Sequence, residues 1–108
     1  MSEPADHAFA PLSVLIVDDE APARERLQDL LGDIADTQPT RVAGTAANGV
    51  EALAILETAP VDLILTDIQM PVMGGIELAR HVGRLERPPA VIFTTAYDEY
   101  AVRAFELA

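Results

Sequence analysis

The 108-residue sequence contains no cysteine and no lysine, and these absences narrow what the chain can do. Without cysteine it can form neither a disulfide nor a thiolate metal site, and its redox compartment stays undetermined. All seven basic residues are arginines, against eighteen acidic residues, which gives a formal net charge of -11. That charge repels nucleic-acid phosphates and anionic lipids, so we expect no direct nucleic-acid contact by this chain and no membrane association.

Long apolar runs and a secretion signal are missing as well. No segment approaches the roughly 18 consecutive apolar residues of a membrane span. The first twelve residues lack the basic start and apolar middle of a signal peptide. The length leaves room for one core. We therefore expect a soluble chain with a disordered tail over residues 1–11 and a single domain over residues 12–108.

The pattern of apolar residues predicts alternating strands and helices. Short β-branched runs indicate four strands, and apolar residues at helical spacing follow each of them. Pro22 suits the first turn of the first helix, and Asn48 can cap the second. Strict alternation favours a doubly wound α/β fold, a parallel sheet with helices on both faces. The predicted strands are 14–17, 41–46, 63–66 and 91–94; the third and fourth helices are expected over 75–85 and 98–107.

Polar residues follow three of the predicted strands at their carboxyl ends. Asp18 and Asp19 follow the first strand, Asp67 the third, and Thr95 the fourth. A single acid in such a place is often only a helix cap or a turn residue. In an open α/β sheet, however, these ends share one edge, where ligands bind. Three of them together therefore indicate a functional site.

Crowded carboxylates repel one another, and a hard divalent cation relieves the repulsion. Mg²⁺ suits this site best, because it takes one or two carboxylates together with water and a phosphate oxygen. A carboxylate can also attack phosphorus and form an acyl phosphate. The residues alone thus predict phosphoryl chemistry at Asp67, with Thr95 able to hydrogen-bond a phosphoryl oxygen.

The segments VLIVDDE (14–20), LILTDIQMPVMGGIEL (63–78) and VIFTTAYDEYA (91–101) resemble the receiver domain of two-component response regulators. The resemblance extends over the chain from Leu12 onward. The sequence after the fourth strand is most similar to that of receivers of the LytTR (LytR/AlgR-like) class. It implies a flavodoxin-like (CheY-like) fold with strand order 2-1-3-4, a cytoplasmic location, a sensor histidine kinase as partner, and an output domain that binds DNA to regulate transcription.

Matched position by position, the resemblance implies a role for five residues. Asp67 is the phosphoacceptor and Thr95 the switch hydroxyl. Asp18, Asp19, Asp67 and the backbone carbonyl of Gln69 hold Mg²⁺, with Asp18 acting through water. The resemblance implies a regulatory domain rather than an enzyme, limited to self-phosphorylation from small phosphodonors and self-dephosphorylation.

One element of the family pattern has no match, namely a lysine at the end of a fifth strand and the helix after it. Residue 108 falls within or just after the fourth helix, so we expect the fourth strand to be a sheet edge. An exposed edge favours a homodimer or a strand-exchanged oligomer. Two alternatives stay open: a receiver-like interaction module that no longer switches, and a Mg²⁺-dependent phosphohydrolase of the haloacid dehalogenase kind. Such hydrolases need an acid two residues after the nucleophile, where this chain has Gln69.

Overall fold

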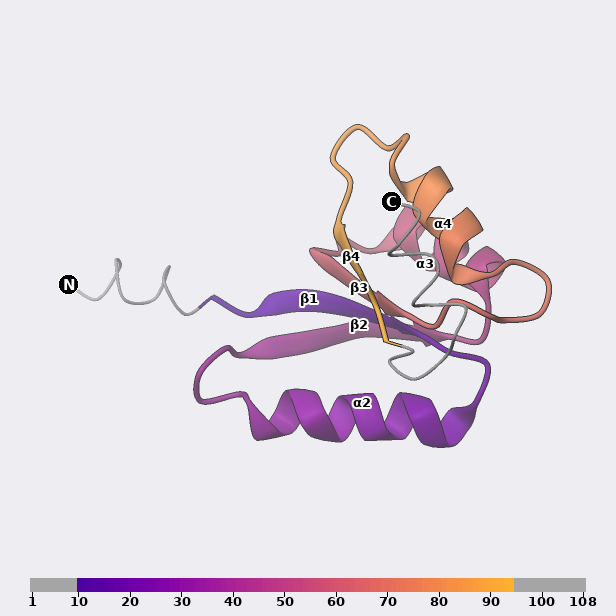
Figure 1. Ribbon diagram of the computed structural model, residues 1–108. Helices are drawn as coiled ribbons and strands as arrows, with labels where there is room; N and C mark the ends of the chain where they lie inside the picture. The colour runs from indigo at the N-terminus through magenta and orange to yellow at the C-terminus, as the bar shows by residue number, and fades with distance from the viewer. Residues whose placement is uncertain (1–9, 95–108) are drawn as a thin grey trace, which may run out of the picture.

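The computed structural model describes residues 10–94, in which four strands alternate with three helices (Figure 1). Thr95, the expected fourth helix and most of the expected tail lie outside this range. No helix among the described residues is long and apolar enough to cross a membrane. The elements are β1 (Leu12–Val17), α2 (Ala21–Asp33), β2 (Thr40–Ala46), α3 (Gly49–Thr58), β3 (Leu63–Thr66), α4 (Gly75–Val82) and β4 (Ala90–Phe93).

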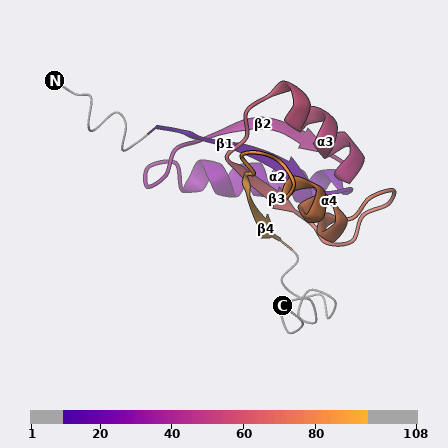
Figure 2. The same ribbon diagram turned by 90° about the horizontal axis from the view of Figure 1, so that it is seen from above.

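The strands form one parallel sheet in the order β2-β1-β3-β4, as expected. The chain leaves β1 in one direction for β2, then returns past β1 to β3 and β4. Because crossovers between parallel strands are right-handed, this reversal places α2 on one face of the sheet and the next two helices on the other. Figures 1 and 2 show this arrangement, with α3 and α4 side by side opposite α2. The reversal creates a switch point between β1 and β3.

The core has two layers because successive residues of β1 point to opposite faces of the sheet. Leu15 and Val17 are fully buried beneath α3 and α4, while Val14 and Ile16 are fully buried on the face covered by α2. The layer below α3 and α4 is the larger one. It includes Ala46, Ala52, Ile64, Leu78 and Val82. The strand β1 is therefore buried on both faces of the sheet, and this packing fixes the position of its carboxyl end.

Local signals placed the helix starts correctly. Pro22 lies in the first turn of α2, and the Asn48 side chain accepts a hydrogen bond from the Glu51 amide at the start of α3, at 2.9 Å. The end of α4 was predicted wrongly at Leu85. The helix stops at Val82, and the following backbone bonds tighten to three-residue turns, because the half-exposed Leu85 offers little packing to hold another turn.

The spacing of apolar residues on α2 does not show which of them are covered. Leu30 and Ile34 share the helical spacing of Leu27 and Leu31, yet they are 52% and 48% exposed, and only Leu27 and Leu31 pack against the sheet. On α3, Val50 is 49% exposed, and the buried positions are Gly49 and Ala52. Helical spacing identifies an apolar stripe, whereas the rotation of the helix on its sheet decides which edge of that stripe is covered.

Candidate functional site

The strand register brings the acidic residues together. Val17 of β1 pairs with Thr66 of β3, so the next residue on each strand, Asp18 and Asp67, emerges at the same edge of the sheet. The Asp67 amide donates to the carbonyl of Val17 at 3.0 Å and keeps this pairing up to the site. One carboxylate oxygen each from Asp18, Asp19 and Asp67 lie within 4.8 Å of one another. Convergence of these three acids is thus confirmed.

The turn between β1 and α2 is held at Asp18. The amide of this residue donates to the carbonyl of Ala46 at 3.0 Å, which anchors it to the end of β2. Its Oδ1 accepts the amide of Glu20 at 2.9 Å, and its own carbonyl accepts Nη1 of Arg24 at 2.7 Å. Asp18 is consequently 6% exposed, whereas Asp19 lies in the open. The two neighbouring acids therefore differ in accessibility to solvent and to ions.

Asp67 is half-buried, and its ionised form is disfavoured. Burial raises the pKa of this carboxyl above its ordinary value, and the negative charges of Asp18 and Asp19 add to the rise. Hydrogen bonds from the amides of Ile68 and Gln69 act in the opposite direction and lower the pKa. Since the net shift is upward, a positive charge placed among the three carboxylates stabilises the ionised form of Asp67.

The loop after Asp67 turns back tightly on the site. The Gly75 amide donates to the carbonyl of Ile68 at 2.8 Å, and a Cβ added at Gly75 would lie 2.1 Å from the carbonyl oxygen of Asp67. The loop also touches α3, because the Gly49 amide donates to the carbonyl of Met73 at 2.9 Å. Glycine is therefore required at position 75, and the loop links Asp67 to the start of α3.

The donor set fits a hard divalent cation. All three side chains offer carboxylate oxygens, the ligand type that Mg²⁺ prefers, and they lie close enough to share one ion. Burial, and after it the charges of Asp18 and Asp19, raise the pKa of Asp67, and such an ion would relieve the repulsion among the three carboxylates. Gln69 is exposed on the loop two residues beyond Asp67. Its carbonyl as a fourth ligand stays a prediction, as does the role of Thr95, which lies outside the described residues.

Reasoning from the sequence missed Arg24. This residue lies in the first two turns of α2, and its side chain reaches back to the carbonyl of Asp18. A positive charge near the start of a helix opposes the helix dipole. This unfavourable position in the helix could have indicated from the sequence that the Arg24 side chain makes a contact outside α2.

The fold and the acidic edge define a class of protein. Over residues 14–108 the chain matches the response regulator receiver domain family, and it belongs to that family. Its fold is the flavodoxin-like (CheY-like) fold of receivers. The response regulatory domain of mrkE from Klebsiella pneumoniae superposes with a TM-score of 0.74 at 33% identity, covering 89% of this chain and 76% of that one. A chain from the complex of histidine kinase ThkA with response regulator TrrA gives a TM-score of 0.66 at 34% identity, covering 82% and 72%.

Full-length relatives narrow the class further. The positive alginate biosynthesis regulatory protein of Pseudomonas aeruginosa is 43% identical over 97 residues, which are 90% of this chain and 38% of that protein. Transcriptional regulatory protein BtsR of Salmonella typhi is 44% identical over 97 residues, 88% of this chain and 38% of that protein. The first similarity supports the LytTR (LytR/AlgR-like) class. The chain thus spans 38% of the length of each of these two relatives.

Proposed function

We propose that this receiver domain accepts a phosphoryl group on Asp67 from a sensor histidine kinase, with Mg²⁺ held by Asp18, Asp19, Asp67 and the carbonyl of Gln69. The convergence of three carboxylates within 4.8 Å at the switch point of the sheet carries this proposal. Asp67 is the half-buried member, framed by the amides of Ile68 and Gln69.

The transfer itself is one displacement at phosphorus. A carboxylate oxygen of Asp67 forms the new P–O bond while the P–N bond to the kinase histidine breaks, and the imidazole takes up a proton. Bound Mg²⁺ supplies positive charge that offsets the charge on the phosphoryl oxygens. The β1–α2 turn holds Asp18 and Asp19 in place, and the amides of Ile68 and Gln69 orient Asp67 during the attack.

Phosphorylation would then act as a switch rather than a turnover step. It adds about one and a half to two negative charges beside two existing carboxylates. We propose that the Thr95 hydroxyl moves to hydrogen-bond a phosphoryl oxygen and that contacts with partners change as a result. Relatives of this chain include transcriptional regulatory proteins, which supports our proposal that a separate output domain, and not this chain, contacts DNA. Because histidine kinases draw their phosphoryl groups from ATP, we place the domain in the cytoplasm.

Labelling with a small phosphodonor tests the site. Wild-type protein incubated with acetyl phosphate and Mg²⁺ should gain one phosphoryl group by mass spectrometry, and Asp67→Asn should gain none. Asp29→Asn, which changes an exposed acid of α2, serves as the matched control and should label normally. Persistent labelling of Asp67→Asn would refute the assignment.

A turnover assay separates this function from phosphohydrolase activity. We expect no repeated hydrolysis of small phosphoesters, because the position two residues after Asp67 holds Gln69 and supplies no general acid. Multiple turnovers per chain with Mg²⁺ would instead favour the enzyme. Retained binding of Mg²⁺ together with stable labelling would exclude a lapsed interaction module.

We also propose that copies of the chain associate. Ile92 on β4 is 51% exposed, which is costly for an apolar strand residue and favours a covering partner. Sheet-edge pairing or helix packing around β4 would cover it. Light scattering at high protein concentration tests this, and a monodisperse monomer with and without acetyl phosphate would contradict it.

A further inference from the structure

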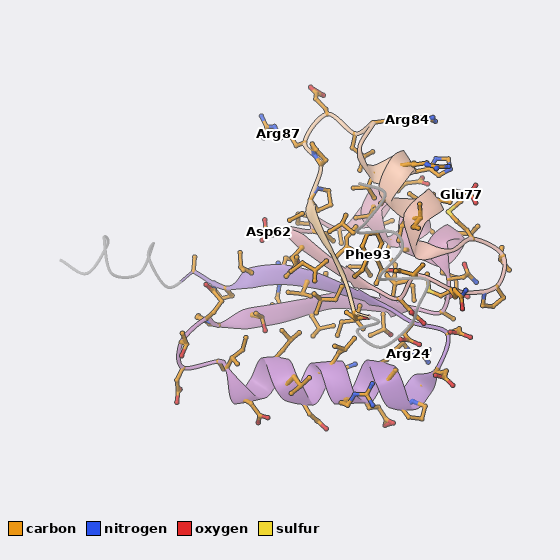
Figure 3. The ribbon with its side chains drawn as sticks, in the orientation of Figure 1. Arg24, Asp62, Glu77, Arg84, Arg87 and Phe93 are labelled. Atoms are coloured by element: carbon orange, nitrogen blue, oxygen red, sulfur yellow. The ribbon has the colours of Figure 1, made fainter. Side chains whose placement is uncertain are left out.

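The β1–α2 turn is closed at both ends by one residue, Arg24. Its amide donates to the carbonyl of Glu20 at 3.2 Å and completes the first turn of α2. Its guanidinium Nη1 then reaches back six residues and donates to the carbonyl of Asp18 at 2.7 Å. Figure 3 shows Arg24 at the end of the molecule where β1 passes into α2, far from Asp62 at the other end of the sheet.

The target of the guanidinium is the backbone and not a carboxylate. Neither Asp18 nor Asp19 has an arginine within ion-pair distance in the part of the chain that the structure describes, where the one ion pair joins His81 to Glu77 at 3.9 Å. An arginine paired with either acid would compete with a cation for that carboxylate. Arg24 instead stays half-buried and leaves the negative charge of the two acids available.

Few other hydrogen bonds could hold Asp18 if the bond from Arg24 were lost. The Asp18 side chain already uses Oδ1 to accept the Glu20 amide, and Glu20 at the helix N-cap makes no side-chain capping bond of its own. A bond from an ionised donor is shorter and roughly twice as strong as a neutral one. The side chain of Arg24 therefore adds the third fixed point of Asp18, after the bonds to Ala46 and Glu20.

We propose that Arg24 is the positioning residue of the acidic centre: it orients Asp18 and Asp19 toward Asp67 through the carbonyl of Asp18 without neutralising them. This inference rests on the proposed function. Arg24 touches neither the phosphoryl group nor the cation in this assignment. Its effect passes through the backbone that presents the two carboxylates.

Binding of Mg²⁺ tests this inference, because a loss of geometry and a loss of charge at Arg24 should change the Mg²⁺ affinity in opposite directions. Removing a positive charge beside three carboxylates would by itself tighten cation binding. Loss of an outer contact that orients ligands typically weakens metal binding by 10-fold or more. We expect the dissociation constant for Mg²⁺, measured by calorimetry, to rise about tenfold in Arg24→Gln.

Arg26→Gln is the matched control. Arg26 is an exposed residue of the same helix, and its substitution removes the same charge. Its Mg²⁺ affinity should equal or slightly exceed that of the wild type. Arg24→Lys keeps the charge but not the planar guanidinium, so its affinity should fall between those of the wild type and Arg24→Gln.

Labelling supplies a second readout. The Mg²⁺ concentration for half-maximal phosphorylation by acetyl phosphate should rise in Arg24→Gln by the same factor, while the rate at saturating Mg²⁺ stays near that of the wild type. If Arg24→Gln does not fold, Arg24→Lys carries the test through its weaker Mg²⁺ binding at an unchanged melting temperature.

The outcomes distinguish this inference from the proposed function. A folded Arg24→Gln that melts earlier but binds Mg²⁺ like Arg26→Gln has lost only stability, and the positioning role is overturned. Tighter binding would show that charge outweighs geometry and would also overturn it. If the wild type fails to bind Mg²⁺, or Asp67→Asn is still labelled, the proposed function fails and the inference fails with it.

Discussion

At the scale of single residues, ionised Asp67 destabilises the folded protein, because the carboxylate is half-buried and lies beside two other acids. Its pKa in the folded protein lies above the ordinary value of 3.8, chiefly because of burial and then because of Asp18 and Asp19. The folded state thus holds the Asp67 proton more tightly than the unfolded chain. Protonated Asp67 therefore contributes to the free energy of unfolding. This contribution is fully present below the pKa of the unfolded chain and is lost as the pH rises through the pKa of the folded protein.

Replacing Asp67 by asparagine should therefore stabilise the metal-free protein near neutral pH. We expect Asp67→Asn to have a higher urea midpoint than the wild type at pH 7.5, and the gap should narrow as the pH is lowered toward the carboxyl range. Asp29→Asn, an exposed change on α2, should show no comparable gap. A gap for Asp67→Asn that is independent of pH would contradict the assigned cause.

Val72 carries a second local cost, in its backbone. It is the one described non-glycine residue with positive φ, at 71°, and it is 81% exposed at the tip of the loop after Asp67. The Met73 amide donates to the Pro71 carbonyl at 2.8 Å, so Val72 is the centre of a strained three-residue turn. Positive φ costs a β-branched residue about 1–2 kcal/mol, and asparagine tolerates it better.

We expect Val72→Asn to raise the free energy of unfolding by about 1 kcal/mol, measured by urea titration. Val50→Asn is the matched control. Val50 is an exposed valine in the helix α3, where valine and asparagine have similar propensities, so its effect should stay within about 0.5 kcal/mol. Equal effects of the two substitutions would argue against strain at Val72.

At the scale of elements, the connection from β3 to α4 depends on the absence of a side chain. Gly75 packs against the carbonyl oxygen of Asp67, where an added Cβ would lie at 2.1 Å. Gly32, near the end of α2, has nothing within 4 Å of an added Cβ. The two glycines therefore predict opposite results for the same substitution.

Gly75→Ala should destabilise the protein by about 3 kcal/mol or more, because backbone must move to admit the methyl group. Gly32→Ala should stabilise it by about 0.5–1 kcal/mol, since alanine favours the helix. Chemical denaturation of both variants checks the pair. Because the Gly75 loop also carries Ile68, whose amide bonds Asp67, we expect phosphorylation of Gly75→Ala to be slowed as well.

At the scale of the whole molecule, a net charge of -11 makes every added cation stabilising to some degree. Screening by sodium chloride is general, whereas binding at the acidic edge is specific. A ligand that binds only the folded state at one hundred times its dissociation constant adds about 2.7 kcal/mol.

Millimolar Mg²⁺ should therefore raise the melting temperature beyond sodium chloride at matched ionic strength. The excess should vanish in Asp19→Asn and persist in Glu25→Gln, an exposed acid of α2 that lies outside the cluster. Scanning calorimetry measures the difference. An equal loss in both variants would show that Mg²⁺ acts only by screening.

Much of this architecture was open to reasoning from sequence. The β-branched runs located all four strands within two residues, and Pro22 and Asn48 marked two helix starts. These signals act between near neighbours in the chain, so they can be read without the fold. The end of α4 was misplaced, and the sequence did not show which apolar residues of α2 are exposed, because packing against the sheet decides both.

What the sequence determined by itself was the alternation of elements and the set of acids at the ends of strands. Tertiary structure decided the rest: that Asp18, Asp19 and Asp67 meet within 4.8 Å, and that Arg24 holds the turn through a carbonyl. The physical reason is that composition and periodicity act along the chain, whereas such meetings depend on strand register and on the reach of a long side chain across a turn.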